Sequence, residues 1–193
     1  MDAPRPNRAD GRIRICLVAA EHRPKTMRGE AVLDSGATRV RRATVNDLAT
    51  VVALRLALLR EYANHPVYGR LHPEVEARAR PLFEQQIKAT DQAIFLAERE
   101  GEVVGIARCA DVKGSPLLVP DRYCYITSVF VRPEHRRHGV LGTLMGHAED
   151  WARTRGLAEM RLHNSTVSKE ARTAWDQLGF EVNEEVRLKH IGR

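Results

Sequence analysis

The sequence contains the run Val129-Phe130-Val131-Arg132-Pro133-Glu134-His135-Arg136-Arg137-His138-Gly139-Val140-Leu141-Gly142. An apolar, strand-like segment ends at a proline, and basic residues and two glycines then lead into an amphipathic helix. The first turn of a helix has free backbone N–H groups and roughly half a positive charge from the helix dipole. Glycine has no Cβ, so a ligand can approach the backbone closely. The run therefore predicts a site for a polyanion, whereas an isolated basic run would more simply be a solvated turn.

The elements around this run alternate between strand and helix patterns. Period-two or β-branched segments predict strands at 39–43, 93–98, 103–109, 123–131 and 160–163, with one or two final strands in 180–191. Helices are predicted after Thr44, which begins a segment resembling a capping box with Asp47, and at about 73–89, where Pro81 should interrupt or restart the helix. Two more are predicted after the glycines, up to Gly156, and at 168–178.

Length and composition indicate one globular domain with an extension. The 193 residues are 43% hydrophobic and 29% charged, and no segment reaches the roughly 18 apolar residues of a membrane span. Residues 1–37 are predicted to be a mostly irregular extension with one strand-like piece at 13–20, and residues 38–193 form the domain. We expect no secretory signal and a cytoplasmic location.

The cysteines and the net charge narrow the chemistry. Cys16, Cys109 and Cys124 are odd in number and scattered, so neither a disulfide framework nor a metal site is expected. Cys109 and Cys124 lie in strand-like segments and are interpreted as buried, inert thiols. A net charge of +6 favours an anionic partner, which a phosphorylated cofactor or a nucleic acid would satisfy equally.

Residues 38–191 resemble the GCN5-related N-acetyltransferase (GNAT) family. The family signature R/Q-x-x-G-x-G/A corresponds to Arg136, Gly139 and Leu141, and the preceding V-x-V-x-P pattern to Val129, Val131 and Pro133. The hairpin at 95–105 and the ending Leu178-Gly179-Phe180, preceded by Ala171 and Trp175, also match in the right order. The resemblance implies an α+β fold in which about four helices flank a mixed, mostly antiparallel sheet of about six or seven strands. Its central strands splay apart to form an acetyl-CoA cleft.

The resemblance also implies a reaction and a binding site. An acetyl group would pass from acetyl-CoA to a primary amine in a ternary complex, without a metal. The pyrophosphate would bind the N–H groups of 137–142, and the pantetheine arm would lie along the free strand edge at 129–131. The backbone N–H of Val129 would stabilise the oxyanion. The residues implied in cofactor binding are Val129, Phe130, Val131, Arg136, Arg137, His138, Gly139, Val140, Leu141, Gly142, Thr143, Ser168 and Trp175.

Three residues depart from the family pattern. Leu141 replaces a Gly or Ala of the signature, Ser168 stands where an Asn often contacts coenzyme A, and Trp175 replaces the Tyr proposed as general acid. Indole has an N–H donor but no useful acidic group. The central strand also lacks the carboxylate that some members use as a base near the position of Thr127.

The base and the acceptor therefore stay open at this point. Deprotonating a lysine-like amine at pH 7 costs about 5 kcal/mol, so a base matters more than an acid. Candidates are Glu61, Asp111, an ordered water and His163, which ends a strand beside the expected cleft, although a strand-end histidine usually has no catalytic role. Acceptor contact and ordinary loop packing are equally good interpretations of a polar and aromatic cluster, Tyr62, Asn64, His65 and Tyr68.

Other functions are weighed against this enzyme. Trp175 and the missing carboxylate would also suit an acyl-CoA-binding module or sensor without catalysis. A nucleic-acid-binding protein ranks last, because no helix-turn-helix or aromatic platform is recognisable. The resemblance allows a homodimer, which is common in the family, but no residue indicates one.

Overall fold

The computed structural model describes residues 36–192. Its elements in chain order are β1 (Arg39–Arg42), a 3-10 helix (Val45–Asp47), α1 (Leu48–Glu61), α2 (Val75–Lys88), β2 (Gln92–Arg99), β3 (Glu102–Lys113), β4 (Arg122–Val131), a second 3-10 helix (Pro133–His135), α3 (Val140–Thr154), β5 (Met160–Leu162) and α4 (Lys169–Gln177). The extension predicted for residues 1–37, with its strand-like piece and Cys16, lies outside the described residues except for residues 36 and 37.

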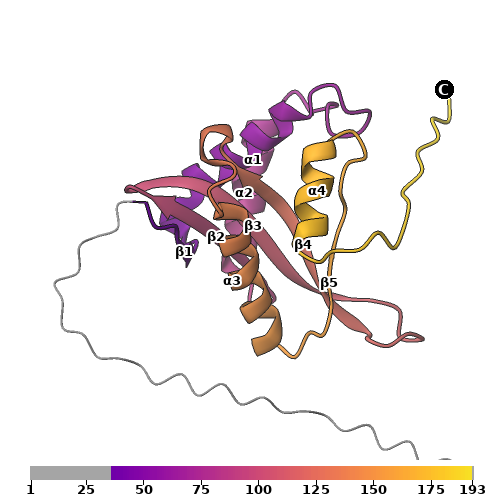
Figure 1. Ribbon diagram of the computed structural model, residues 1–193. Helices are drawn as coiled ribbons and strands as arrows, with labels where there is room; N and C mark the ends of the chain where they lie inside the picture. The colour runs from indigo at the N-terminus through magenta and orange to yellow at the C-terminus, as the bar shows by residue number, and fades with distance from the viewer. Residues whose placement is uncertain (1–35, 193) are drawn as a thin grey trace, which may run out of the picture. The chain divides into compact units, whose positions relative to one another are not determined.

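The strands of this part of the chain form one sheet in the order β1-β2-β3-β4-β5 (Figure 1). Neighbouring strands run antiparallel from β1 to β4, and β5 joins β4 in parallel. The β2–β3 hairpin turns at Glu100 and Gly101, which have φ of 52° and 82°. The mixed, mostly antiparallel sheet with four helices confirms the predicted fold class.

Helices cover both faces of the sheet, α3 on one and α1 with α2 on the other (Figure 1). Under α3 the core contains Leu144 and Met145 packed on β2, β3 and β4, and under α1 and α2 it contains Val51, Leu54 and Phe83. Gly105 lets α3 approach the sheet, since a Cβ there would lie 3.2 Å from Leu144 Cδ1. The apolar stripe predicted for α3 is therefore confirmed as its buried face.

A β-bulge opens the centre of the sheet. Thr127 of β4 lies opposite Arg108, and Phe130 lies opposite Ile106, so Ser128 and Val129 together face the single residue Ala107 of β3. Ser128 is buried and has a φ of 55°, a left-handed conformation that is uncommon outside glycine. On the other side, β5 pairs with β4 only from Cys124 to Ile126. Beyond Ile126 the two strands separate.

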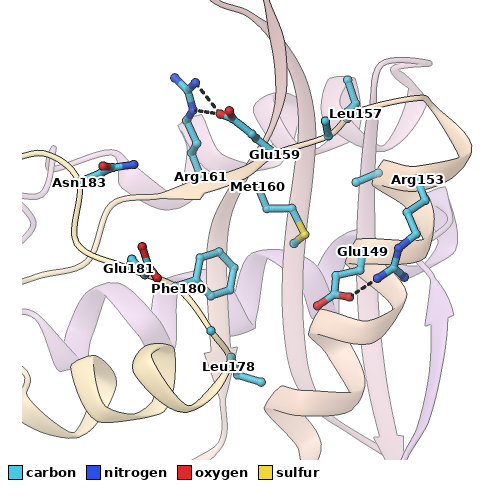
Figure 2. A pocket seen from close by; sticks show the side chains of 13 residues that line it. Glu149, Arg153, Leu157, Glu159, Met160, Arg161, Leu178, Phe180, Glu181 and Asn183 are labelled. Carbon is cyan, nitrogen blue, oxygen red and sulfur yellow. Dashed lines mark hydrogen bonds and ion pairs between the residues drawn. The ribbon is translucent and has the colours of Figure 1, made fainter. Parts of the chain in front are cut away.

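The expectation of six or seven strands is too high for residues 36–192, which contain five. The segment predicted to supply the last ones, 180–191, has no regular secondary structure. Its apolar side chains, such as Val182 and Val186, are 87% and 78% exposed. A segment with a strand-like pattern forms a strand only where a neighbouring strand has a free edge to pair with it. The neighbouring strand β5 is only three residues long. Beside β5 lies a hollow of about 430 Å³, which Leu157, Met160 and Phe180 line (Figure 2).

α2 also differs from its prediction, because it runs through Pro81 without interruption. Proline removes one intrahelical hydrogen bond and disfavours the helix interior. Here Ala79 and Phe83 lie buried on either side of Pro81, and their packing holds the helix together. Tertiary contacts thus outweigh the local preference.

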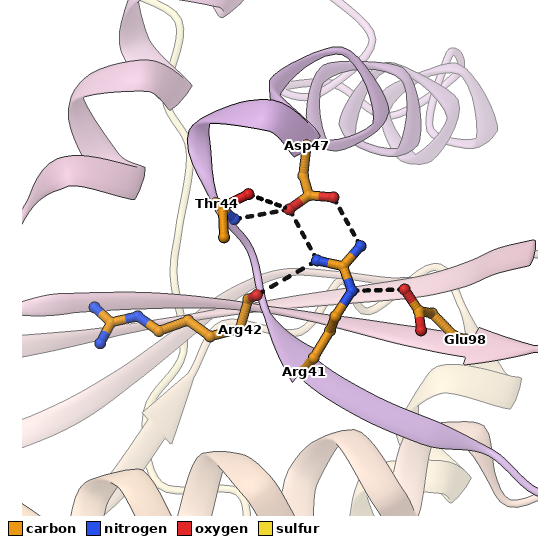
Figure 3. A network of polar contacts seen from close by, with 5 residues as sticks. All are labelled: Arg41, Arg42, Thr44, Asp47 and Glu98. Atoms are coloured by element: carbon orange, nitrogen blue, oxygen red, sulfur yellow. Dashed lines mark hydrogen bonds and ion pairs between the residues drawn. The ribbon is translucent and has the colours of Figure 1, made fainter.

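The predicted capping segment joins the first strand to the first helix. Asp47 accepts hydrogen bonds from the backbone N–H of Thr44 at 2.8 Å and from Arg41 at 2.7 and 2.8 Å, and Arg41 also pairs with Glu98 of β2 at 2.6 Å (Figure 3). Hydrogen bonding to Arg41 holds the pKa of the Asp47 carboxyl well below its usual range. The network fixes the chain direction between β1 and α1.

Further predictions from the sequence concern the cysteines, a metal site and membrane-spanning segments. Cys109 and Cys124 are free and buried, as expected, and a hydrogen bond to Cys124 together with burial raises the pKa of the Cys109 thiol. Within residues 36–192 no three metal-ligating side chains gather into a cluster. None of the described helices is long and apolar enough to cross a membrane.

Candidate functional site

The N-terminus of α3 presents free backbone amides, as the sequence predicts. Gly139 caps the helix with a φ of 76°, and the preceding Arg137 is also left-handed, with a φ of 64°. Thr143 donates its backbone N–H to the Gly139 carbonyl at 3.0 Å, and its hydroxyl donates to the same oxygen at 3.1 Å. The amides of residues 140–142 precede this first helical bond, so they are the ones available to an anion.

Arg136 is held in place by two contacts. Its Nε donates to the Val131 carbonyl at 3.0 Å, and its Nη2 pairs with both oxygens of Glu61 at 2.6 and 2.8 Å. These contacts tie the loop to the end of β4 and to the end of α1. Arg137 is the exposed one, with its guanidinium 3.7 Å from Glu170 at the start of α4. Arg136 is therefore a positioning residue, and Arg137 supplies exposed positive charge beside the groove.

The edge of β4 beyond the bulge is unpaired on the side of β5. The Arg132 backbone N–H donates to the Val104 carbonyl of β3. Because the direction of backbone groups repeats every second residue, those of Phe130 also point toward β3. Val131 alternates with Phe130 and points its backbone groups away from β3, which agrees with the bond from Arg136 to the Val131 carbonyl. Val129 lies between the bulge and Val131, at the start of the part of β4 that β5 leaves unpaired, and its N–H stays the predicted oxyanion donor.

A groove of about 810 Å³ joins these two features. It runs between the end of β4, the start of α3 and one side of α4. It brings together most residues predicted for cofactor binding: Val129, Phe130, Val131, Arg136, Arg137, Gly139, Leu141, Gly142, Ser168 and Trp175. His138, Val140 and Thr143 do not line it. The Val140 side chain is core, 1% exposed, and His138 bonds through Nδ1 to the Arg136 carbonyl at 2.7 Å.

α4 forms the far wall of the groove. Ser168 is its N-cap, and its Oγ accepts the backbone N–H of Ala171 at 3.1 Å, which leaves the hydroxyl hydrogen free to donate. Trp175 lines the groove and packs edge-on against Phe180, with ring centroids 5.4 Å apart. Ser168 and Trp175 therefore lie in the wall of the groove, as does Leu141, the third departure from the family pattern.

The structure separates the three candidate bases. Asp111 lies on the α3 side of the sheet with Arg122 and Arg155, and hydrogen bonding to Arg122 lowers the pKa of its carboxyl. Glu61 is held by Arg136. His163 lies on the α1 face of the sheet, as Glu61 at the end of α1 does, and its Nδ1 is 3.0 Å from the hydroxyl of Tyr125.

The early loop is packed and also borders this face of the sheet. His65 stacks on Tyr68 with centroids 4.5 Å apart, and its Nδ1 accepts the backbone N–H of Tyr68 at 3.1 Å. Tyr62 lines the groove, and burial raises the pKa of its hydroxyl. The contacts of this cluster support loop packing, while acceptor contact stays a prediction; Asn64 is exposed.

Sequence reasoning missed Tyr125, Arg108 and Arg55. Period-two alternation along β4 places Tyr125 and Thr127 on the face opposite buried Cys124 and Ile126. That alternation could be seen in the sequence. Which residues of β3 lie opposite Tyr125 and Thr127 could not, because the register between two strands depends on the whole sheet.

Comparisons with known proteins agree with this geometry. A sequence model of the Acetyltransferase (GNAT) family matches residues 56–180, more than half of the chain. The chain is 22% identical over 142 residues to the uncharacterized N-acetyltransferase YhfO of Bacillus subtilis, a match that covers 74% of this chain and 89% of that protein.

Solved structures share the fold. An acetyltransferase of Clostridium acetobutylicum crystallised with acetyl-CoA has a TM-score of 0.65 at 16% identity, over 80% of this chain and 96% of that one. The aminoglycoside 6'-N-acetyltransferase AAC(6')-Ih of Acinetobacter baumannii has a TM-score of 0.63 at 20% identity, over 81% and 100%. At these identities the likeness establishes the fold alone.

Proposed function

Since the chain belongs to the GNAT family of acetyltransferases, we propose that it transfers the acetyl group of acetyl-CoA to a primary amine within a ternary complex. The observation that carries this proposal is the groove itself. One end holds the free amides of α3, and the other holds the unpaired edge of β4. A long ligand with a polyanionic end and an amide-containing arm fits that sequence of donors.

Each part of acetyl-CoA then has a partner. The pyrophosphate accepts hydrogen bonds from the amides of 140–142, with Arg137 adding positive charge. The pantetheine arm pairs with the backbone groups of Val129 and Val131 like an added strand. The N–H of Val129 donates to the thioester oxygen, where negative charge develops as the amine attacks. Positioning supplies much of the rate in such a site.

Protons are handled without the usual tyrosine. An alkyl thiol has a pKa of about 8.5, so release of a thiolate at pH 7 costs only about 2 kcal/mol, and water can protonate it. The attacking amine must lose a proton, and His163 is the side chain proposed to accept it. Its contact with Tyr125 orients the ring, since Nδ1 is the atom engaged.

The test is release of free coenzyme A thiol from acetyl-CoA with a panel of primary amines, with the acetylated product identified by mass spectrometry. We expect amine-dependent release, and an activity loss of at least tenfold in His163→Ala with acetyl-CoA affinity unchanged. Tight acetyl-CoA binding without turnover of any amine would instead favour the acyl-CoA sensor, which Trp175 and the absent strand carboxylate also suit. Failure to bind acetyl-CoA would contradict both.

A further inference from the structure

Two arginines on the α1 face of the sheet have no acidic partner within residues 36–192. Arg55 of α1 makes no ion pair there, and no carboxylate contributes to its pKa, which burial lowers. Arg108 of β3 is held by a neutral group, Gln92 Oε1, at 2.9 and 2.7 Å from its Nε and Nη2. Burial also lowers the pKa of Arg108, and among residues 36–192 the exposed Asp91 is the only carboxylate that affects this pKa.

Both arginines lie where α1 packs on the sheet. Arg108 lies opposite Thr127, on the face of β3 and β4 where α1 packs. The charge of Arg108 lowers the pKa of Arg55, so the two groups are close enough to repel each other. Tyr68 contributes to the pKa of Arg55, and Arg108 contributes to the pKa of Tyr125. Both phenol groups therefore lie near the two arginines. The group therefore consists of two cations and hydroxyl donors.

Other arginines around this site are neutralised, and the contrast is informative. Arg136 is paired with Glu61, and Arg161 with Glu159 at 2.7 Å. Desolvating a charge is costly unless a partner compensates for it, and two like charges add to that cost. A fold that leaves two half-buried arginines unpaired therefore points to a ligand that supplies the anion.

The contacts of Tyr125 place Arg108 relative to the proposed base. Tyr125 lies on the same face of β4 as Thr127, the cross-strand partner of Arg108, and is two residues from it along the strand. Its hydroxyl is 3.0 Å from Nδ1 of His163. An acceptor amine at His163 and an anion at Arg108 therefore lie on either side of one tyrosine side chain, which favours a small acceptor.

Building on the proposed acetyl transfer, we propose that the acceptor is a small primary amine that also carries a carboxylate or a phosphate, which Arg55 and Arg108 bind. Both anions offer the planar or tripodal oxygens that a guanidinium donates to. A polycationic acceptor would meet two uncompensated positive charges. The aminoglycosides named for similar structures are therefore poor acceptors here.

Matched amines test this directly. The panel consists of two- and four-carbon primary amines that end in a carboxylate, a phosphate ester, a hydroxyl or a second ammonium group, so that chain length is matched and the terminal group varies. We expect kcat/KM at least tenfold higher for one anionic class than for the hydroxyl amines, and lowest values for the diamines. The carboxylate and phosphate arms show which anion is bound.

Variants connect the preference to the two arginines. In Arg55→Gln and Arg108→Gln the ratio of kcat/KM for anionic amines to that for hydroxyl amines should fall to threefold or less. The fall should come mainly from a higher KM for the anionic amines, with acetyl-CoA affinity unchanged. Arg60→Gln is the matched control, because Arg60 lies on the same helix, carries the same charge and pairs with exposed Glu76 at 3.3 Å. It should keep the full preference.

Equal use of hydroxyl and anionic amines, preference for diamines, or a preference that survives both variants would overturn the inference. These outcomes leave acetyl transfer itself intact. If no amine is turned over, calorimetric binding of the same amines to the protein with and without coenzyme A decides the question. Anionic amines must then bind at least tenfold more tightly than hydroxyl amines, and Arg108→Gln must abolish the difference.

Discussion

Asp47 is a single residue on which the junction of β1 and α1 depends. Its carboxylate, with a side chain only 13% exposed, accepts bonds from Arg41 and from the backbone of Thr44. We expect Asp47→Asn to lower the free energy of unfolding at pH 7 by about 1–3 kcal/mol, because charge-assisted bonds to Arg41 are lost. Urea denaturation with circular dichroism measures this change. Asp150→Asn, at an exposed pair with Arg153, should change little.

The same substitution has a pH signature. The pKa of Asp47 is lower in the folded protein than in the unfolded chain, so its stabilisation is complete above the unfolded pKa of about 3.9. It is lost as the pH falls toward the lower folded pKa. The stability difference between wild type and Asp47→Asn should therefore be constant from pH 7 to about pH 5 and shrink below that. A difference that grows on acidification would contradict this assignment.

Single residues also show where sequence reasoning succeeds and fails. Gly139 was predicted from the sequence as a glycine at the start of α3 that a ligand can approach closely, and the structure places it as the N-cap of that helix with a positive φ. The engagement of Arg136 by Glu61 was not, since 75 residues separate them in the sequence. Arg55 and Arg108 look like ordinary surface arginines until the sheet register places them together.

At the scale of elements, α2 contains a proline that we expect to lower the free energy of unfolding. Pro81 is exposed, lacks an N–H and lies well inside the helix. We expect Pro81→Ala to raise the free energy of unfolding by about 1–3 kcal/mol, because the missing hydrogen bond is restored and the ring clash disappears. Thermal and urea denaturation check this, with Arg80→Ala as a neighbouring exposed control that should have little effect. A lower stability for Pro81→Ala would mean that the proline is matched to a local distortion.

The elements that could be predicted from the sequence are those that depend on residues close together in the chain. The hairpin of β2 and β3 and the helix α3 follow from short-range periodicity and their turn residues, and both lie where predicted. The bulge at Ser128 and the separation of β4 from β5 depend on pairing between distant segments. The strands expected in 180–191 failed for the same reason, because a strand pattern does not reveal whether an edge is available.

At the scale of the whole molecule, acetyl-CoA should stabilise the fold by binding it. The groove draws on α1, β4, α3 and α4, so the unfolded chain has no equivalent site. At a concentration 100 times the Kd, binding adds about 2.7 kcal/mol, which should raise Tm by about 5–10 °C for a chain of this size. Differential scanning fluorimetry measures the shift. ATP at the same concentration is the control for unspecific polyanion binding and should give a smaller shift.

The most direct test of the account concerns Gly142 in the first turn of α3. A Cβ at Gly142 or at Gly146, one turn further on, meets no atom within 4 Å, so both positions tolerate a side chain. Gly142→Glu places a carboxylate among the amides assigned to the pyrophosphate, and an acidic residue there also suits the helix dipole. Isothermal titration calorimetry should show acetyl-CoA affinity at least tenfold weaker for folded Gly142→Glu, about 1.4 kcal/mol, and unchanged for Gly146→Glu. Equal affinity in the two variants would contradict the placement of acetyl-CoA in this groove.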